Sequence, residues 1–199
     1  MTSSQFHPIT DWVSPGARVL DLGCGDGTLL AHLRKVHRIS GYGLEIDIDN
    51  IVKCMAKGVN AIQADLDQGL TDFRDLSFDT VILLQTLQAV RFPGNLLREM
   101  LRVGREGVVT FPNFGHWSAR VQLALGGRMP VTKTLPSQWY DSTNLHLFTL
   151  KDFETLCRDE GIEVVQRVLL SADGHESTLS KAWPTLFTEV AVYRLRQRG

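Results

Sequence analysis

Cysteine is scarce in this sequence and follows no pairing pattern. The three cysteines, Cys24, Cys54 and Cys157, are far apart, odd in number and outside any Cys-x-x-Cys arrangement. The sequence therefore indicates neither a disulfide framework nor a zinc site, and we expect no bound metal. We expect Cys54 and Cys157 to be small packing residues on helices, and Cys24 to have a spatial rather than a nucleophilic role.

The chain also lacks an excess of charge and a long apolar run. The net charge is −1 and no long basic run is present, which argues against a nucleic-acid-binding surface. No apolar stretch reaches the length of a membrane span, and the N-terminus lacks the pattern of a secretory signal. We therefore expect a cytoplasmic protein. A chain of 199 residues can bury one core, so residues 1–199 are predicted to form a single domain.

What the chain does have is a set of alternating glycines near its N-terminus. Residues 17–22 form a short, mostly apolar run, as expected for a parallel strand buried on both faces. Gly23, Gly25 and Gly27 follow, and from Leu29 onward apolar residues recur at helical spacing. A strand, a glycine turn and a helix form the opening unit of a doubly wound sheet, whose ligands lie beyond the carboxyl ends of the strands.

The spacing of these glycines disfavours a dinucleotide site. A Gly-x-Gly-x-x-Gly fingerprint starting at Gly23 would need glycine where the sequence has Thr28. Asp26 is the expected N-cap of the helix, and its charge would repel a pyrophosphate there. Glu45, which ends the next predicted strand, is placed to accept hydrogen bonds from both ribose hydroxyls and would repel the 2′-phosphate of NADP. The pattern favours an adenosine ligand without phosphate.

Asp21, the glycines and Glu45 resemble the nucleotide site of class I S-adenosylmethionine-dependent methyltransferases. The resemblance implies that Asp21 lies near the methionine amino group, that the glycines line the methionine and ribose portions, and that Glu45 holds the ribose diol. In that family a third acid contacts the adenine amino group, and Asp65 matches it here. The alternative is that these acids only cap helices or turns, but three acids at three successive strand ends favour the ligand site.

The remaining pattern is α/β. Asp47 is the expected cap of a second helix, with its apolar face formed by Ile48, Ile51, Val52 and Met55 and its end at Gly58. Strands are predicted at residues 78–84 and 107–111, a helix near Pro93, and another after a capping-box pair, Thr149 and Asp152. Segments 162–170 and 187–195 are β-rich. The predicted fold is a Rossmann-like, doubly wound, seven-stranded sheet of the class I methyltransferase type, mostly parallel with an antiparallel C-terminal hairpin.

One connection is much longer than usual. Residues 112–148, between a predicted strand and the next helix, are rich in aromatic side chains, which argues against disorder. Since the segment leaves the carboxyl end of a strand, we expect it to form a lid over the ligand site or a partner surface. Within it Trp117, Val121, Ala124 and Leu125 form an apolar stripe near Arg120 and Arg128. This stripe could touch a membrane or a partner, but we expect it to cover the protein's own core.

The candidate catalytic residues lie in or beside this segment. His116 and His146 could act as bases in methyl transfer, although a histidine among aromatics is more often a packing residue. Gln85 and Gln88 follow the fourth predicted strand, where class I methyltransferases place acceptor-binding residues. The motif there is not Asn/Asp-Pro-Pro-Tyr, which weakens the case for methylation of DNA bases or glutamine.

Three further motifs resemble the MetW family of methionine biosynthesis proteins. They are Leu-Gln-Thr-Leu-Gln-Ala at residues 84–89, Phe-Pro-Asn-Phe-Gly-His-Trp at 111–117, and Trp-Tyr-Asp-x-x-Asn-x-His-x-x-Thr-x-x-Asp-Phe at 139–153. The resemblance runs from about Val13 to Tyr193. Thr143 departs from it, because the family has proline there.

The MetW resemblance implies a protein that works with a homoserine O-acyltransferase, in a family with no established methylated substrate. The sequence fits this, because its nucleotide site is clear and its acceptor site is not. The first hypothesis is a protein that binds S-adenosylmethionine and supports or regulates the acyltransferase. The second is a methyltransferase acting on a small molecule, and an NAD- or metal-dependent enzyme is a distant third.

Overall fold

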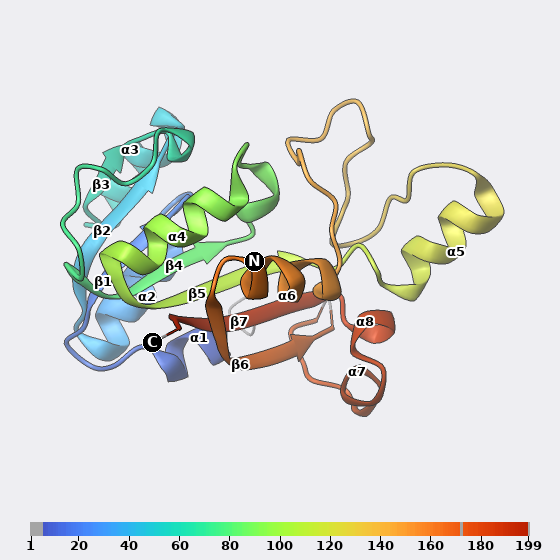
Figure 1. Cartoon of the computed structure of the whole chain (residues 1–199). Helices are drawn as coiled ribbons and strands as arrows, with labels where there is room; N and C mark the ends of the chain where they lie inside the picture. Colours follow the sequence, from blue (N-terminus) through green and yellow to red (C-terminus); the bar gives the residue numbers. More distant parts are fainter. Residues whose placement is uncertain (1–5, 172, 199) are drawn as a thin grey trace.

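Seven strands form one sheet in the part of the chain that the structure, a computed structural model, describes, namely residues 6–171 and 173–198. The order is β3-β2-β1-β4-β5-β7-β6 (Figure 1). Positions 1–5, 172 and 199 of the predicted domain lie outside the described residues. The strands are β1 (Arg18–Leu22), β2 (Ser40–Glu45), β3 (Ala61–Gln63), β4 (Phe78–Leu84), β5 (Gly104–Pro112), β6 (Ile162–Leu170) and β7 (Val190–Gln197).

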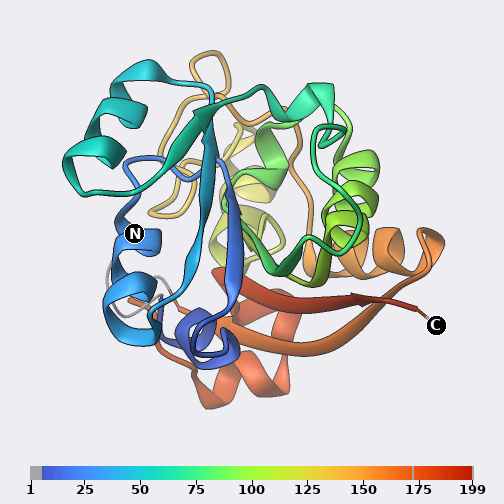
Figure 2. The same ribbon diagram turned by 90° about the vertical axis from the view of Figure 1, so that its left-hand side faces the viewer.

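Helices cover both faces of this sheet (Figure 2). On one face α1 (His7–Trp12), α2 (Thr28–His37) and α3 (Ile48–Ala56) pack on strand residues such as Val19. On the other face α4 (Pro93–Val103) and α6 (Leu150–Asp159) pack on residues such as Leu20. Because successive residues of a strand point to opposite faces, Val19 and Leu20 of β1 are buried on opposite faces of the sheet. The predicted α/β class and doubly wound, mostly parallel sheet are confirmed.

The direction of winding reverses between β1 and β4. The chain proceeds from β1 outward to β2 and β3, and then crosses to β4 on the other side of β1. Asp21 of β1 is level with Gly43 of β2 and Ile82 of β4. A crevice at such a reversal is the usual ligand position in sheets of this type.

The C-terminal strands are antiparallel, as predicted, but no tight turn joins them. β7 pairs antiparallel with both β5 and β6. Between β6 and β7 lie α7 (Thr178–Ala182) and α8 (Pro184–Phe187), so β7 begins later than the predicted start at Phe187. Pro184 at the first position of α8 favours a helical start, which the β-rich composition did not indicate.

One local prediction about the first helices is wrong. The N-cap of α2 is Gly27, not Asp26, whose carboxylate instead accepts hydrogen bonds from the Thr28 N–H and hydroxyl at 3.1 and 2.7 Å. Asp47 does cap α3, but the apolar face of that helix is exposed: Ile48, Val52 and Met55 are 59%, 58% and 69% accessible. The physical reason is that α3 lies at the border of the sheet, over β2 and the short edge strand β3, where little surface is available to cover it.

Candidate functional site

The glycine turn is fastened to the end of β2. The N–H groups of Gly23 and Cys24 donate to the Leu44 carbonyl oxygen at 2.8 and 3.0 Å. Gly23 has φ +70°, and a Cβ on it would lie 2.6 Å from the Thr86 hydroxyl oxygen, so no other residue fits. Gly25 has φ +54°, yet a Cβ there would meet no atom within 4 Å. The turn is therefore closed toward Thr86 and open at Gly25.

Glu45 holds this turn in place. Its Oε2 accepts the Gly25 N–H at 2.8 Å, and its Oε1 accepts the N–H groups of Ile46 and Asp47 at 2.9 and 3.0 Å. The residue is 8% exposed, so these bonds replace the hydration that burial removes from the carboxylate. A carboxylate has about four acceptor positions. Three backbone donors thus leave capacity for a hydroxyl of a ligand.

Asp21 is buried beneath the turn and lacks part of its hydrogen bonding. It is 1% exposed, and its Oδ1 has no hydrogen-bond partner among the described residues. Burial, and secondarily the charge of Glu45, raise the pKa of Asp21 to about 7. A buried carboxyl group with an unused oxygen is suited to a cationic group of a ligand, which would favour its ionised form.

Asp65 caps a short turn that carries a second acid. Its Oδ1 accepts the Asp67 N–H at 3.0 Å at the start of the 3₁₀ turn η2 (Leu66–Gln68). The Oδ1 of Asp67 in turn accepts the Arg91 N–H at 2.7 Å, from the loop after β4. Asp65 therefore caps a turn, which is the alternative role considered for it. It also lines a cavity beside the glycine turn, where its carboxylate can contact a ligand.

A cavity of about 290 Å³ lies beside the glycine turn, and Asp21, Gly25 and Gly27 are not among the residues that line it. Gly23, Glu45 and Asp65 line it together with Asp67 and Thr86. Its apolar wall is formed by Leu44, Ile46, Ala64, Leu66, Ala89 and Val90. Its size and mixture of apolar wall and few polar groups are those of a small-molecule site. Sequence reasoning missed Asp67 and Thr86, although Thr86 lies in a motif that the sequence had singled out.

A larger cleft of about 500 Å³ lies at the amino ends of the parallel strands and includes Trp12 and Arg105. Two of its arginines, Arg194 and Arg196, are already paired with Glu106. No glycine of the turn lines this cleft. Among the described residues no group of three or more histidine, cysteine, aspartate or glutamate side chains could hold a metal ion. No described helix combines the length and apolar character needed to cross a membrane.

Comparison with known proteins agrees with this architecture. The family model of methionine biosynthesis protein MetW matches residues 3–195. The chain belongs to the MetW family. It is 34% identical over 193 residues to the bifunctional methionine biosynthesis protein MetXA/MetW of Rhodopirellula baltica, covering 92% of this chain but only 31% of that relative. It is also 25% identical over 183 residues to a ubiquinone biosynthesis O-methyltransferase of Paracidovorax citrulli, covering 82% of this chain and 75% of the relative.

Solved structures share the fold at low sequence identity. An S-adenosylmethionine-dependent methyltransferase from Mesorhizobium loti has a TM-score of 0.72 at 15% identity, over 98% of both chains. A complex of the Haloferax volcanii Trm112 methyltransferase activator with a putative methyltransferase also gives 0.72, at 17% identity, over 98% of this chain and 90% of that one. These likenesses show a fold of the class I methyltransferase type.

The glutamines of this MetW-family protein connect the cavity to the long segment. Gln85 has a left-handed backbone (φ +47°), and its N–H donates to the Thr110 carbonyl oxygen at 2.9 Å. Gln88 lies in the 3₁₀ turn η3 (Leu87–Ala89), and its carbonyl oxygen accepts the N–H groups of Leu145 and His146 at 2.8 and 3.0 Å. Neither glutamine lines the 290 Å³ cavity, but their neighbours Thr86 and Ala89 do.

His116 has a structural role at the start of α5 (Trp117–Gly126). Its Nδ1 lies 2.8 Å from the Ser118 hydroxyl and accepts the Ser118 N–H at 3.4 Å, and its Nε2 lies 3.8 Å from Oε1 of Glu189. Burial lowers the pKa of His116, which favours the neutral ring. Its neighbour Asn113 is buried and donates to the carbonyl oxygens of Thr185 and Thr188, which ties β5 to the C-terminal segment.

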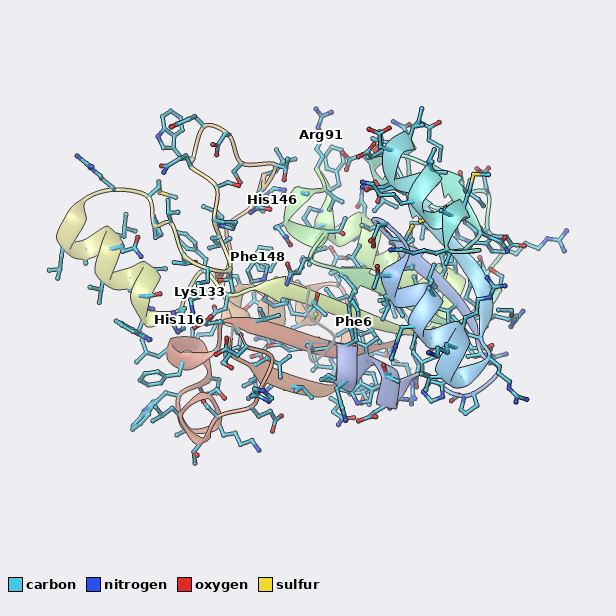
Figure 3. All side chains as sticks on the ribbon, turned by 180° about the vertical axis from the view of Figure 1, so that it is seen from behind. Phe6, Arg91, His116, Lys133, His146 and Phe148 are labelled. Carbon is cyan, nitrogen blue, oxygen red and sulfur yellow. The ribbon has the colours of Figure 1, made fainter. Side chains whose placement is uncertain are left out.

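His146 occupies a different position, on the loop that meets η3, and Figure 3 shows it well away from His116. Its Nε2 is buried without a hydrogen-bond partner among the described residues, as is Oε1 of Gln88. His146 lines an apolar cavity of about 180 Å³ with Leu87 and Phe148. The structure therefore does not bring the two histidines together in one site.

Proposed function

We propose that this MetW-family protein binds S-adenosylmethionine in the cavity beside the glycine turn and supports or regulates a homoserine O-acyltransferase. The observation that carries the ligand assignment is the buried Asp21 with an unused Oδ1 beneath a turn that is open at Gly25. Asp21 would hold the amino group of the ligand, Glu45 its ribose hydroxyls and Asp65 its adenine amino group. S-Adenosylmethionine would supply an activated methyl group, or would act as a ligand only.

The partner assignment is supported by the relative whose name joins MetXA to MetW. This chain spans 31% of that protein, so most of the relative's length belongs to something other than the MetW-like part. Two functions joined in one polypeptide commonly act together. The family resemblance names the second function as homoserine O-acylation.

A physical link between ligand and partner runs through η3. Thr86 and Ala89 line the cavity, while the carbonyl oxygen of Gln88, between them, holds the end of the long segment at Leu145 and His146. A ligand that contacts the cavity side of this turn would stabilise one arrangement of the segment. Regulation requires that the ligand bind with different affinity to the free and the acyltransferase-bound protein.

The test is an acylation assay with the purified acyltransferase encoded in the same genome. We expect higher O-acylhomoserine formation when this protein is present, and a further change on adding S-adenosylmethionine. Unchanged activity, together with no complex on size-exclusion chromatography, would reject the partner role. Calorimetry with S-adenosylhomocysteine tests the ligand assignment separately.

The alternative is an S-adenosylmethionine-dependent methyltransferase of a small molecule, favoured by the similarity to a ubiquinone biosynthesis O-methyltransferase. Incubation with methyl-labelled S-adenosylmethionine and a metabolite extract distinguishes the two. Transfer of label to an extract component supports the alternative, and binding without transfer supports the regulatory function.

A further inference from the structure

α5 is an apolar helix that buries almost nothing. Ala119 is the one buried residue of this helix. Trp117, Val121 and Leu125, spaced one turn apart, are 47%, 44% and 85% exposed. Figure 1 shows α5 projecting away from the sheet. The prediction that this stripe covers the protein's own core is therefore wrong. A short helix is marginal without tertiary packing, so an apolar helix in this position needs a partner molecule.

The loop after α5 also exposes apolar side chains. Trp139 and Tyr140 are 75% and 71% exposed and contact each other edge to face, with ring centroids 5.7 Å apart. The loop also exposes Leu145 and Leu147. We call the exposed apolar side chains of α5 and this loop the projecting face. Large apolar side chains exposed on neighbouring segments mark interaction sites, and large aromatic side chains are common among the residues that dominate binding energy.

The projecting face also contains a cavity. A cavity of about 310 Å³ lies within residues 114–147, and its lining includes Phe114, Met129, Leu135 and Trp139. A cavity with a partly apolar lining and the exposed Trp139 at its border accommodates an apolar anchor side chain of a protein partner.

Internal hydrogen bonds hold the projecting face in shape. The guanidinium Nε of Arg120 donates to the Gly115 carbonyl oxygen at 2.6 Å, and the N–H of Val131 donates to the side-chain oxygen of Gln122 at 3.1 Å. The imidazole of His116 caps the first turn of α5. A surface arranged before binding loses less conformational entropy when a partner docks.

The charge around the projecting face is cationic. Residues 112–148 include Arg120, Arg128 and Lys133 but a single carboxylate, Asp141, whereas the whole chain has a net charge of −1. A complementary partner surface is therefore apolar at its centre and acidic at its rim.

We propose that the projecting face is the docking surface for the homoserine O-acyltransferase. This inference rests on the proposed function, and it adds which surface of this protein binds the acyltransferase. The fused relative supports this occupant, because a partner domain carried on the same polypeptide is always within reach of this surface. The base of the segment is attached to η3 at Gln88, so the surface that binds the acyltransferase is connected to the wall of the ligand cavity.

The experiment measures binding of the purified acyltransferase by wild-type protein and two double variants. Val121→Glu with Leu125→Glu places two carboxylates on the projecting face. The matched control, Val52→Glu with Met55→Glu, changes two apolar residues of α3 that are also largely exposed, at 58% and 69%. We expect at least a hundredfold loss of affinity for the α5 variant and less than a threefold change for the α3 variant. Both should unfold at the wild-type temperature, since the substituted side chains are exposed. Trp139→Ala, which alters the loop instead of the helix, should weaken binding about tenfold.

Other outcomes would overturn the inference in distinguishable ways. Wild-type protein that forms no complex rejects the proposed function, and this surface with it. A complex that persists in the α5 variant and in Trp139→Ala rejects the surface alone. Light scattering that shows a wild-type dimer, an α5-variant monomer and unimpaired acyltransferase binding would assign the face to a second copy of this chain. Loss of binding to phosphatidylglycerol vesicles with the acyltransferase complex intact would assign it to a membrane.

Discussion

The cavity beside the glycine turn and the projecting face differ in how their residues are satisfied. Around the cavity the chain supplies its own partners: Glu45 accepts three backbone N–H groups, and Thr86 fills the space left by Gly23. On the projecting face, side chains such as Leu125 and Trp139 have no core to enter. The difference teaches that the polar groups around the cavity need only a small ligand to complete their contacts. The apolar side chains of the projecting face are buried only when another large surface covers them.

The largest expected effect comes from Asp21→Asn. Asp21 has a folded-state pKa of about 7, above its ordinary value of 3.8, so the folded state binds the proton more tightly than the unfolded state. Its stabilising contribution is full below about pH 4 and is lost as the pH rises to about 7. Removing the charge should therefore raise the free energy of unfolding at pH 8 by up to about 4 kcal/mol. Urea unfolding at pH 8 and pH 4 checks this, and an equal effect at both pH values would contradict it.

Gly23→Ala should destabilise the protein by about 2–4 kcal/mol, from left-handed backbone strain and the contact with Thr86. Gly16→Ala is the control, because Gly16 has a similar φ of +75° but no atom within 4 Å of an added Cβ. Urea unfolding of both variants separates strain from contact. If the two lose the same stability, the close approach of Thr86 is not important.

Glu45→Ala should weaken S-adenosylmethionine binding about ten- to a hundredfold, equivalent to about 1.5–3 kcal/mol for hydrogen bonds to a charged group. Asp47→Ala removes a neighbouring carboxylate that caps α3 through the Asp49 N–H and does not line the cavity. It should lower stability by about 1 kcal/mol and leave affinity unchanged. Calorimetry on both variants tests the assignment, which fails if Glu45→Ala binds as the wild type does.

The pH dependence of ligand affinity should have its midpoint near the pKa of Asp21. If the ionised carboxylate holds the ligand's amino group, affinity is constant above pH 7 and falls about tenfold for each pH unit below it. Calorimetry between pH 5.5 and 8.5 measures this, with Asp21→Asn as the control that removes the dependence. A flat profile for the wild type would show that Asp21 does not bind the cationic group.

The smallest effect is expected on the projecting face. Leu125→Ser should change the free energy of unfolding by less than about 0.5 kcal/mol, because the side chain is 85% exposed. Leu83→Ala, at a fully buried position of β4, should lower it by about 2–5 kcal/mol. A large loss of stability for Leu125→Ser in thermal unfolding would show that α5 packs on its own chain and would remove the contrast between the two regions.

Much of the fold could be predicted because its signals are local. β4 and β6 begin and end at the predicted residues, and the Thr149–Asp152 capping box starts α6 as expected. The helices α7 and α8 were not predicted, because their short sequences have no helical periodicity. Of the cavity residues, Thr86 and Asp67 were missed, since each contributes through contacts with segments distant in sequence.

The sequence by itself determined the doubly wound sheet, the glycine turn and the acids at three strand ends, because strand burial, backbone freedom and chain reversal each depend on a few adjacent residues. Only the tertiary structure decided which apolar stripes are buried. Those of α3 and α5 have the composition of core helices, yet both are exposed. Periodicity shows that a helix has an apolar face, but what covers that face depends on the position of the helix in the whole assembly.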